Sequence, residues 1–470
     1  MRPPPTPTLM GRDGQRPRMP DDDPPDPTHV VTVFLRHDAD VLLVRRSETS
    51  GPPDGQWDAV GGPIADGGPP SGASGTEGAD PATGDPEQAA RAAVAERGFD
   101  PGEATLVRAG DALTVSSAGD ALVVHPFLFE AATRAVEDEG ESVGEGESGG
   151  EGGSDHEWVP PTEILRRETV PWLWDAYDRV RPTVETIRAD RNHGSASLSV
   201  RALEVLRDEA AVAVERGGDW RALAATGRAL RDARPAMPVV ANRVNRAMAA
   251  ASDERTPAAV ESAAADGLDR ALTADADAAA RAAEAVPDRV ATLSRSGTVL
   301  SALARADPGF VLVAESRPGR EGVAMAEAVA AETGTEVLLA TDAAMADRLA
   351  ETGVEAVVVG ADAVRPDGSV VNKVGTRGVA AAAASEGLPC YVVAASDKVA
   401  TEDTLDREPR DPAEVYDGDA DVTATNPTFG VTPASLVTAV VTETGRLDGE
   451  AVRALAAAHR KRAAWDTADE

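Results

Sequence analysis

Residues 355–398 contain side chains that could bind a phosphate next to a general acid or base. Residues 356–359 form an apolar run long enough for a buried strand, and Asp362 follows just past its C-terminal end. Asn372 and Lys373 stand in a polar segment bounded by glycines, which we interpret as a loop. A carboxyl group and an ammonium group this close in sequence could together move a proton and hold an anion.

The second half of this stretch predicts a helix of small residues over 378–385 and a strand over 391–394, followed by Lys398. Gly375 and Thr376 stand where that helix begins, and the free amides of a helix start favour an anion. The chain contains only three lysines, and two of them, Lys373 and Lys398, fall here while the third is Lys461. That concentration indicates a site that requires an ammonium group.

The elements that must position these residues alternate between strand and helix from residue 288 onward. Strands are predicted over 290–293, 310–314 and 336–340, each followed by a helix, which indicates an α/β fold with a parallel, doubly wound sheet. Polar residues follow each strand, and a parallel sheet gathers such residues along one edge, where ligands bind. The residues in question are Ser294, Ser296, Glu315, Arg317, Asp342, Asp362, Asp397 and Lys398.

The region before this sheet is predicted to be helical. Apolar residues recur there at spacings of three and four. We expect helices over 172–188, 199–216, 219–233, 239–250, 257–272 and 274–285. Residues 190–195 interrupt them with a polar turn that contains Gly194, and His193 in that turn is expected to cap a helix or face solvent.

The N-terminal third predicts a smaller unit of strands around one helix. Two strands joined by a turn at 37–40 come first, and Pro86 starts a helix that ends near Gly98. Further strands are expected over 104–108 and 121–129. Residues 67–85 are expected to form a loop, and 137–155 an acidic Gly/Ser tract without a core.

Composition limits the possible partners and the compartment. The chain has 470 residues, a formal net charge of −34 and an isoelectric point near 4.5, which disfavours free nucleic acid as a partner. Acid excess with few lysines is typical of proteins adapted to concentrated salt. The single cysteine, Cys390, excludes an intramolecular disulfide and is expected to pack as a buried thiol. We expect a cytoplasmic protein, because no membrane-length apolar run or signal-peptide core is present.

The N-terminal unit resembles a Nudix domain in its order of strand, strand, GQWDAVGG, helix with the pattern AxxR, strands and WVP. That family hydrolyses nucleoside diphosphates linked to another moiety, with helix glutamates holding a divalent metal at the pyrophosphate. Here Gly68 and two helix alanines stand at glutamate positions of the family pattern, and only Glu96 remains. The resemblance therefore implies a degenerate domain that packs or senses a ligand, and magnesium only if the domain is active.

The motifs GADAVRPDGSVVNKVGT, ESRPGREG and NPTFGVTP resemble the family of the α, β and δ subunits of eukaryotic translation initiation factor 2B. The family also holds methylthioribose-1-phosphate isomerase and ribose-1,5-bisphosphate isomerase. The similarity covers roughly residues 188–445. It implies a helical part followed by a Rossmann-like part, no cofactor in this region, and assembly into a homodimer or a higher oligomer.

This resemblance implies roles for individual residues. The isomerases use a Cys after the first strand and an Asp in the GAD motif; Asp362 matches the Asp, and Ser294 stands at the Cys position. A serine hydroxyl is a much weaker acid than a thiol. Residues at family positions around ligand and phosphate are Arg317, Asn372 and Lys373.

Three functions follow as alternatives. The first is an initiation-factor-2B-like protein that binds a phosphorylated sugar or nucleotide and acts in regulation. The second is an aldose–ketose isomerase of the ribose-1,5-bisphosphate or methylthioribose-1-phosphate type, with Asp362 and Ser294 as catalytic candidates. The third is Nudix hydrolysis. The predicted organisation is a disordered leader at 1–28, the Nudix-like domain at 29–175, a helical part at 176–287, the Rossmann-like ligand domain at 288–446 and a C-terminal helix or tail at 447–470.

Overall fold

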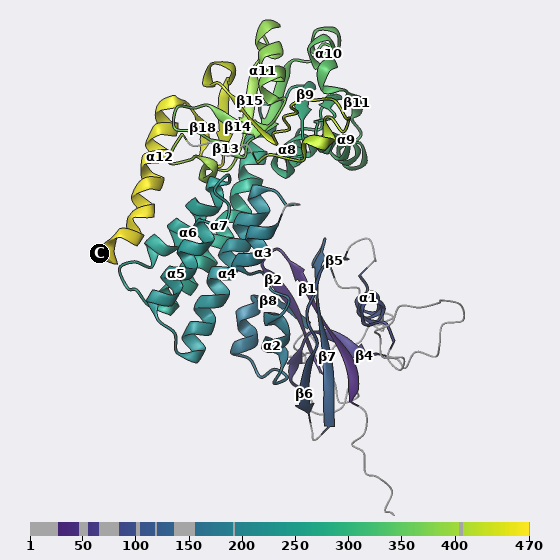
Figure 1. Ribbon diagram of the computed structural model, residues 1–470, viewed down its shortest axis with the longest axis vertical. Coiled ribbons are helices and arrows are strands. Elements are labelled where there is room, and N and C mark those ends of the chain that lie inside the picture. The colour runs from purple at the N-terminus through teal and green to yellow at the C-terminus, as the bar shows by residue number, and fades with distance from the viewer. Residues whose placement is uncertain are drawn as a thin grey trace, which may run out of the picture.

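The protein is described here by a computed structural model, which covers residues 27–46, 55–64, 84–99, 104–117, 120–135, 156–190, 193–403 and 408–469. Figure 1 shows three parts along the long axis: an N-terminal sheet, a group of helices, and a second sheet flanked by helices. Residues 1–26 of the predicted leader, the loop at 67–85 except for its last residues, and the acidic tract at 137–155 lie outside the described residues, whereas Thr28, the last predicted leader residue, already begins a strand. None of the described helices is both long and apolar enough to cross a membrane.

The N-terminal part is a mixed sheet in which eight described strands take part. Its centre is β1 (Thr28–His37), which pairs in parallel with β7 (Asp120–Ala131) and antiparallel with its other neighbours. The remaining strands are β2 (Asp40–Arg45), β3 (Trp57–Asp58), β4 (Val60–Pro63), β5 (Ala104–Ala109), β6 (Leu113–Ser117) and β8 (His156–Val159). The prediction of two strands joined by a turn is confirmed, whereas the short strands β3, β4, β6 and β8 were not predicted.

Both faces of this sheet are covered, because successive side chains of a strand point to opposite sides. Val33 and Leu35 pack with helix α1 (Pro86–Glu96), while Phe34 packs with helix α2 (Leu173–Asp178). The helix predicted from Pro86 is confirmed. The long helix predicted over 172–188 is wrong: it is split into α2 and α3 (Val184–Ala189), because Pro182 cannot continue a helix and Thr183 starts a new one with a capping box.

The middle part is a helical group with its own hydrophobic core. It contains α4 (Ser195–Arg216), α5 (Trp220–Arg231), α6 (Pro238–Ala250) and α7 (Pro257–Ala283). The break predicted between residues 272 and 274 is wrong, because α7 runs on through Thr273. The Thr273 hydroxyl donates to the carbonyl of Asp269, one turn earlier, so this side chain is accommodated within the helix. The continuous α7 reaches from this core to the second sheet, where its last turns pack.

The second sheet has the strand order β11-β10-β9-β12-β15-β17-β18 and is parallel except for β18. The predicted parallel sheet is thus confirmed. Its chain order changes direction between β9 and β12, which is the position where a crevice opens in folds of this kind. The strands are β9 (Arg289–Leu293), β10 (Phe310–Ala314), β11 (Glu336–Ala340), β12 (Ala356–Gly360), β15 (Cys390–Val393), β17 (Ala439–Thr442) and β18 (Gly445–Leu447).

Helices cover both faces of this sheet. One face packs against the end of α7, α8 (Gly297–Ala306) and α9 (Glu321–Glu332). The other packs against α10 (Met345–Glu351), α11 (Thr376–Ser385) and α12 (Gly449–Ala463). After α12 the chain returns to the helical part, where Trp465 is buried in its core and donates to Asn245 at 2.8 Å.

A small antiparallel sheet lies beside the main one and was not predicted. It consists of β13 (Ala363–Val364), β14 (Val370–Lys373) and β16 (Phe429–Thr432). Asn372 and Lys373 therefore end a strand instead of lying in a loop, and they pair with Gly430 and Phe429. This pairing fixes their backbone more firmly than the predicted glycine-bounded loop would.

Candidate functional site

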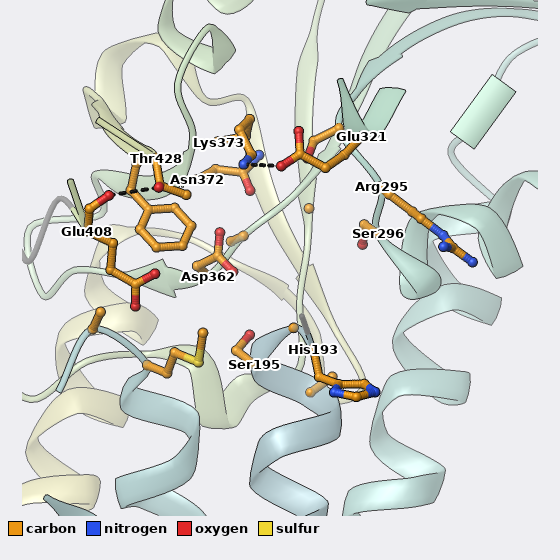
Figure 2. A pocket seen from close by; sticks show the side chains of 18 of the residues that line it. His193, Ser195, Arg295, Ser296, Glu321, Asp362, Asn372, Lys373, Glu408 and Thr428 are labelled. Carbon is orange, nitrogen blue, oxygen red and sulfur yellow. Dashed lines mark hydrogen bonds and ion pairs between the residues drawn. The ribbon is translucent and has the colours of Figure 1, made fainter. Parts of the chain in front are cut away.

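A cavity of 1420 Å³ lies where the helical part meets the carboxyl edge of the parallel sheet. Its walls come from the start of α4, the connection between α5 and α6, the segments after β9 and β12, the end of β14, and residues 408–429. Figure 2 shows side chains from these separate segments pointing into a common space. The cavity therefore occupies the predicted crevice at the point where strand order reverses.

Five predicted site residues line this cavity: Ser294, Asp362, Asn372, Lys373 and Lys398. Ser294, Asp362 and Lys398 follow three different strands of the parallel sheet, so their meeting is a consequence of that sheet. Asn372 and Lys373 reach the cavity from β14 of the small antiparallel sheet. The other predicted site residues, Arg317, Gly375 and Thr376, are not part of the lining.

Asp362 lies at the centre of the view in Figure 2 and is half-buried. Its backbone N–H donates to the carbonyl of Val371 at 2.9 Å, which fixes the residue beside β14. Within the described part of the chain, no hydrogen bond or ion pair involves its carboxyl group. Burial raises the pKa of that carboxyl above its ordinary value; the charges of Lys398 and Lys373 oppose the shift and the charge of Glu408 adds to it. A carboxyl group in this state can donate a proton into the cavity.

Lys373 carries a positive charge into the same space. Its Nζ lies 2.6 Å from Oε1 of Glu321, at the start of α9, and the lysine side chain is almost fully buried. The other carboxylate oxygen of Glu321 has no hydrogen-bond partner in the part of the chain that the structure describes. The ion pair holds the ammonium group toward the cavity, as Figure 2 shows.

Lys398 is the second buried ammonium group at the cavity. Its Nζ donates to the carbonyl of Ala361 at 2.7 Å, next to Asp362. The preceding residue, Asp397, contacts Arg246 and Arg243 from α6. These contacts anchor the end of β15 to the helical part, so the position of Lys398 depends on both parts of the chain.

Hydrogen bonds from neighbouring residues fix the backbone of Lys373. Thr376 donates from Oγ1 to the carbonyl of Lys373 at 2.7 Å, and the Asn372 side chain donates to that hydroxyl at 3.1 Å. Gly375 takes a φ of 105°, a conformation that side-chain-bearing residues rarely adopt. Gly375 and Thr376 thus position the lysine instead of lining the cavity.

Arg317 points elsewhere. Its backbone N–H donates to Asp342 at 2.6 Å, and its guanidinium donates to the carbonyl of Glu414 at 3.3 Å. It therefore braces the segment around Glu414, which forms part of the cavity wall.

Ser294 stands at the start of a strained turn. Its φ is 61°, and its N–H donates at 2.6 Å to the hydroxyl of Ser316, which itself has a φ of 65°. Two further cavity residues with side chains, Arg320 and Glu408, also have positive φ. Backbone strain of this kind costs on the order of 1–3 kcal/mol per residue and concentrates at functional sites.

Sequence reasoning missed cavity residues from outside the parallel sheet, including Ser195, Arg234, Glu408 and Thr428. Ser195 is the first residue of α4, a helix of 22 residues whose start has no side-chain cap and lines the cavity. An uncapped helix start favours an anion. The polar turn before it, with Gly194, was the available signal. His193 is exposed and its Nδ1 lies 2.7 Å from Asp190, in keeping with the expected solvent-facing role.

Comparisons with known proteins match the second and third parts of the chain. The model of the Initiation factor 2 subunit family matches residues 191–449. A ribose 1,5-bisphosphate isomerase of Haloferax volcanii is 34% identical over 299 residues, which are 58% of this chain and 92% of that protein. A methylthioribose-1-phosphate isomerase of Nostoc punctiforme is 37% identical over 150 residues, 30% of this chain and 42% of that protein.

A similar solved structure is that of the translation initiation factor eIF-2B of Pyrococcus horikoshii OT3. It is 27% identical, with a TM-score of 0.47, and the match covers 56% of this chain and 94% of the other.

Proposed function

This chain belongs to the Initiation factor 2 subunit family, and we propose that it is an aldose–ketose isomerase that acts on a phosphorylated pentose. The sequence alone favoured a regulatory binding protein. The similarity over 92% of a ribose 1,5-bisphosphate isomerase supports the isomerase alternative better. The reaction can be written as proton movements between the substrate and protein side chains.

One observation carries the proposal: the Asp362 carboxyl group has no hydrogen bond or ion pair within the described residues and faces a cavity that also holds two ammonium groups. Converting an aldose 1-phosphate into the 2-ketose 1-phosphate moves the proton on C2 to C1 and the hydroxyl proton of O2 to the ring oxygen. Electrons and atoms balance without a co-reactant. A carboxyl group that holds its proton can give it to the ring oxygen as the ring opens.

The cavity also offers groups for the phosphate. Lys373 and the start of α4 line the cavity from segments that lie far apart in the sequence. Both an ammonium group and a helix start favour an anion. Charge-assisted hydrogen bonds of this kind are the stronger class, at about 1.5–3 kcal/mol each. A phosphate held there would place the sugar carbons near Asp362.

Ser294 favours a second candidate function, which is ligand binding without turnover. Its hydroxyl stands where the related isomerases have a thiol, and a hydroxyl is a poor proton donor and acceptor at neutral pH. In that case the bound phosphorylated sugar or nucleotide would act as a regulatory ligand.

For the N-terminal part we propose a Nudix-like fold without hydrolytic activity. Its mixed sheet with α1 on one face supports the fold. Glu96, the one glutamate left from the family pattern, is exposed near the end of α1. A single carboxylate is too few to bind a divalent metal at a pyrophosphate.

The experiment is a ³¹P NMR assay of the full chain with ribose 1,5-bisphosphate, at low and at high KCl. We expect conversion to the ketose by the wild type and a loss of about 10³-fold in Asp362→Asn, within the range for removal of a general acid. Asp347→Asn, an exposed carboxylate of α10, is the matched control. Ligand-dependent thermal stabilisation without conversion would contradict the isomerase proposal and leave regulatory binding.

A further inference from the structure

Glu408 is a second carboxyl group that shares the cavity with Asp362. We propose that Glu408 is the base that carries the carbon-bound proton from C2 to C1, the step for which Ser294 is chemically unsuited. This inference rests on the isomerase function proposed above and deepens it by naming a second catalytic residue.

The backbone of Glu408 is held in a specific and strained conformation. Its φ is 40°, in the left-handed region that residues with side chains rarely adopt. Its carbonyl accepts two hydrogen bonds from Thr428, one from the hydroxyl at 2.7 Å and one from the N–H at 3.2 Å. Figure 2 shows the resulting direction, with the Glu408 carboxylate pointing toward the space beside Asp362.

An arginine from the helical part fixes the side chain. Nη2 of Arg234 lies 3.1 Å from Oε1 of Glu408, and the arginine side chain is 6% exposed while that of Glu408 is 28% exposed. The guanidinium also donates to the backbone carbonyl of Asp190. The ion pair thus holds a carboxylate at the cavity and leaves part of it accessible to a ligand.

Glu408 and Asp362 act on each other through their charges. Burial is the main cause of the raised pKa of Asp362, and the negative charge of Glu408 adds to it. The two carboxyl groups also differ in their partners, because Glu408 contacts the Arg234 guanidinium whereas Asp362 has no ion pair among the described residues. Here the half-buried Asp362 is the acid and the ion-paired Glu408 is the base.

The other acidic groups of the cavity are engaged differently. Glu321 pairs with Lys373, and Glu414 accepts two hydrogen bonds from Arg410, both at 3.0 Å, and one from Asn426. Asp275 lies on α7 beside Arg243, and Asp411 accepts a hydrogen bond from the N–H of Ala413 at 2.9 Å. Among the described cavity residues, Glu408 is the acid whose charge acts on Asp362.

The proposed cycle returns every proton. The Glu408 carboxylate takes the proton from C2, becomes a carboxylic acid and delivers the same proton to C1. Asp362 gives its proton to the ring oxygen as the bond between C1 and that oxygen breaks. It regains a proton from the O2 hydroxyl as the C2 carbonyl forms. Both side chains end as they began, and no oxidant or reductant takes part.

The test compares Glu408→Gln with wild type in the ³¹P NMR assay and in ligand-dependent thermal stabilisation by ribose 1,5-bisphosphate. Glutamine keeps the size of the side chain and a hydrogen-bond acceptor for Arg234 but cannot take a proton. We expect turnover to fall by at least about 100-fold with the thermal shift retained. The matched control is Glu402→Gln, an exposed carboxylate on the same connection that does not line the cavity, and we expect it to leave turnover unchanged.

A second variant separates catalysis from structure. In Glu408→Ala, added formate can enter the space of the missing carboxylate, so we expect it to restore part of the turnover. Turnover of Glu408→Gln within about threefold of wild type would overturn the inference while leaving the isomerase function standing. Loss of the thermal shift in Glu408→Gln would also overturn it, because Glu408 would then be a binding or structural residue. A wild type that converts no phosphorylated pentose would overturn both proposals.

Discussion

Two groups of buried charged side chains occupy different parts of this molecule and behave differently. The interdomain cluster lies between the N-terminal sheet and α4, and consists of Arg36, Glu130, Arg201, Glu204, Arg207 and Asp208. The cavity cluster lies between the helical part and the parallel sheet, and consists of Arg234, Glu321, Asp362, Lys373, Lys398 and Glu408. Each has three positive and three negative groups, so net charge does not distinguish them.

The difference lies in how the carboxylates are paired. In the interdomain cluster, Glu204 contacts both Arg201, at 2.6 Å, and Arg36, at 3.5 Å. Burial alone would raise the pKa of Glu204, but the surrounding arginines outweigh it and lower the pKa. In the cavity cluster, burial wins over two lysines and the pKa of Asp362 rises. Burial also raises the pKa of Asp208 in the interdomain cluster, although Asp208 contacts Arg207. What marks the candidate site is therefore a carboxyl group at an open cavity that has no ion pair among the described residues.

The largest expected effect on folding comes from breaking the interdomain cluster. Glu204→Gln removes the fully buried carboxylate that Arg36 and Arg201 share and leaves them, within the described residues, only the partly exposed Glu130. Breaking a buried ion pair costs up to about 3–5 kcal/mol in the free energy of unfolding. Urea denaturation followed by circular dichroism measures this loss. Turnover per folded molecule should stay close to wild type, and a specific loss of turnover would remove the distinction between the two clusters.

In the cavity cluster, Lys373→Met should act on the ligand more than on the fold. Losing one charge-assisted contact to a phosphate costs about 1.5–3 kcal/mol, or roughly a 10- to 100-fold weaker Kd. Isothermal titration with ribose 1,5-bisphosphate measures it. The matched variant Lys461→Met, near the end of α12 and outside the cavity lining, should bind like wild type. Equal affinity of both variants and the wild type would show that the phosphate binds elsewhere.

Glu204 and Asp362, one carboxyl group from each cluster, should respond to pH in opposite directions. Glu204 has a lowered pKa in the folded state, so its contribution is present above its ordinary pKa and is lost as pH falls. Asp362 has a raised pKa, so the folded state binds its proton more tightly and stability declines as pH rises from the ordinary value through the raised one. Unfolding free energies of Glu204→Gln and Asp362→Asn across pH 3–8 should each lose the corresponding slope. A shared direction in the two variants would contradict this assignment.

The smallest expected effect concerns Cys390, which lies outside both clusters. It is 2% exposed, and burial raises the pKa of its thiol to about 12. We expect no labelling of the native protein by a thiol reagent at pH 8, and complete labelling after unfolding in urea. Because Cys390 is the only cysteine, its labelling rate reports opening of the parallel sheet directly. Fast labelling of the native chain would contradict the packing around β15.

The part of the site that could be predicted from the sequence consists of residues that follow parallel strands, since such residues gather at one edge of the sheet. Ser294, Asp362 and Lys398 each follow a parallel strand, and the sheet brings them together whatever the side chains between them are. This rule predicts which edge of the sheet a residue lies at, but it does not predict where the side chain of that residue points. Arg317 also follows a strand, yet its guanidinium turns to the Glu414 carbonyl.

The remaining wall of the cavity depends on contacts that no local pattern contains. Arg234 and Glu408 are 174 residues apart in the chain, and neither stands at the end of a strand. Lys373 was predicted in a loop because its own strand partner is Phe429 of β16, more than fifty residues later. Local propensity cannot supply such long-range pairing. The predicted oligomer, the Nudix-like domain and the adaptation to salt stay predictions.

The central claim is that ligand chemistry belongs to the cavity cluster while the interdomain cluster only holds the fold. Hydrogen exchange of the full chain, with and without ribose 1,5-bisphosphate, tests it most directly. We expect the ligand to slow amide exchange at residues 195–198, 294–299 and 372–376, and to leave the strands β1 and β7 unchanged. Protection confined to the N-terminal sheet would contradict the claim.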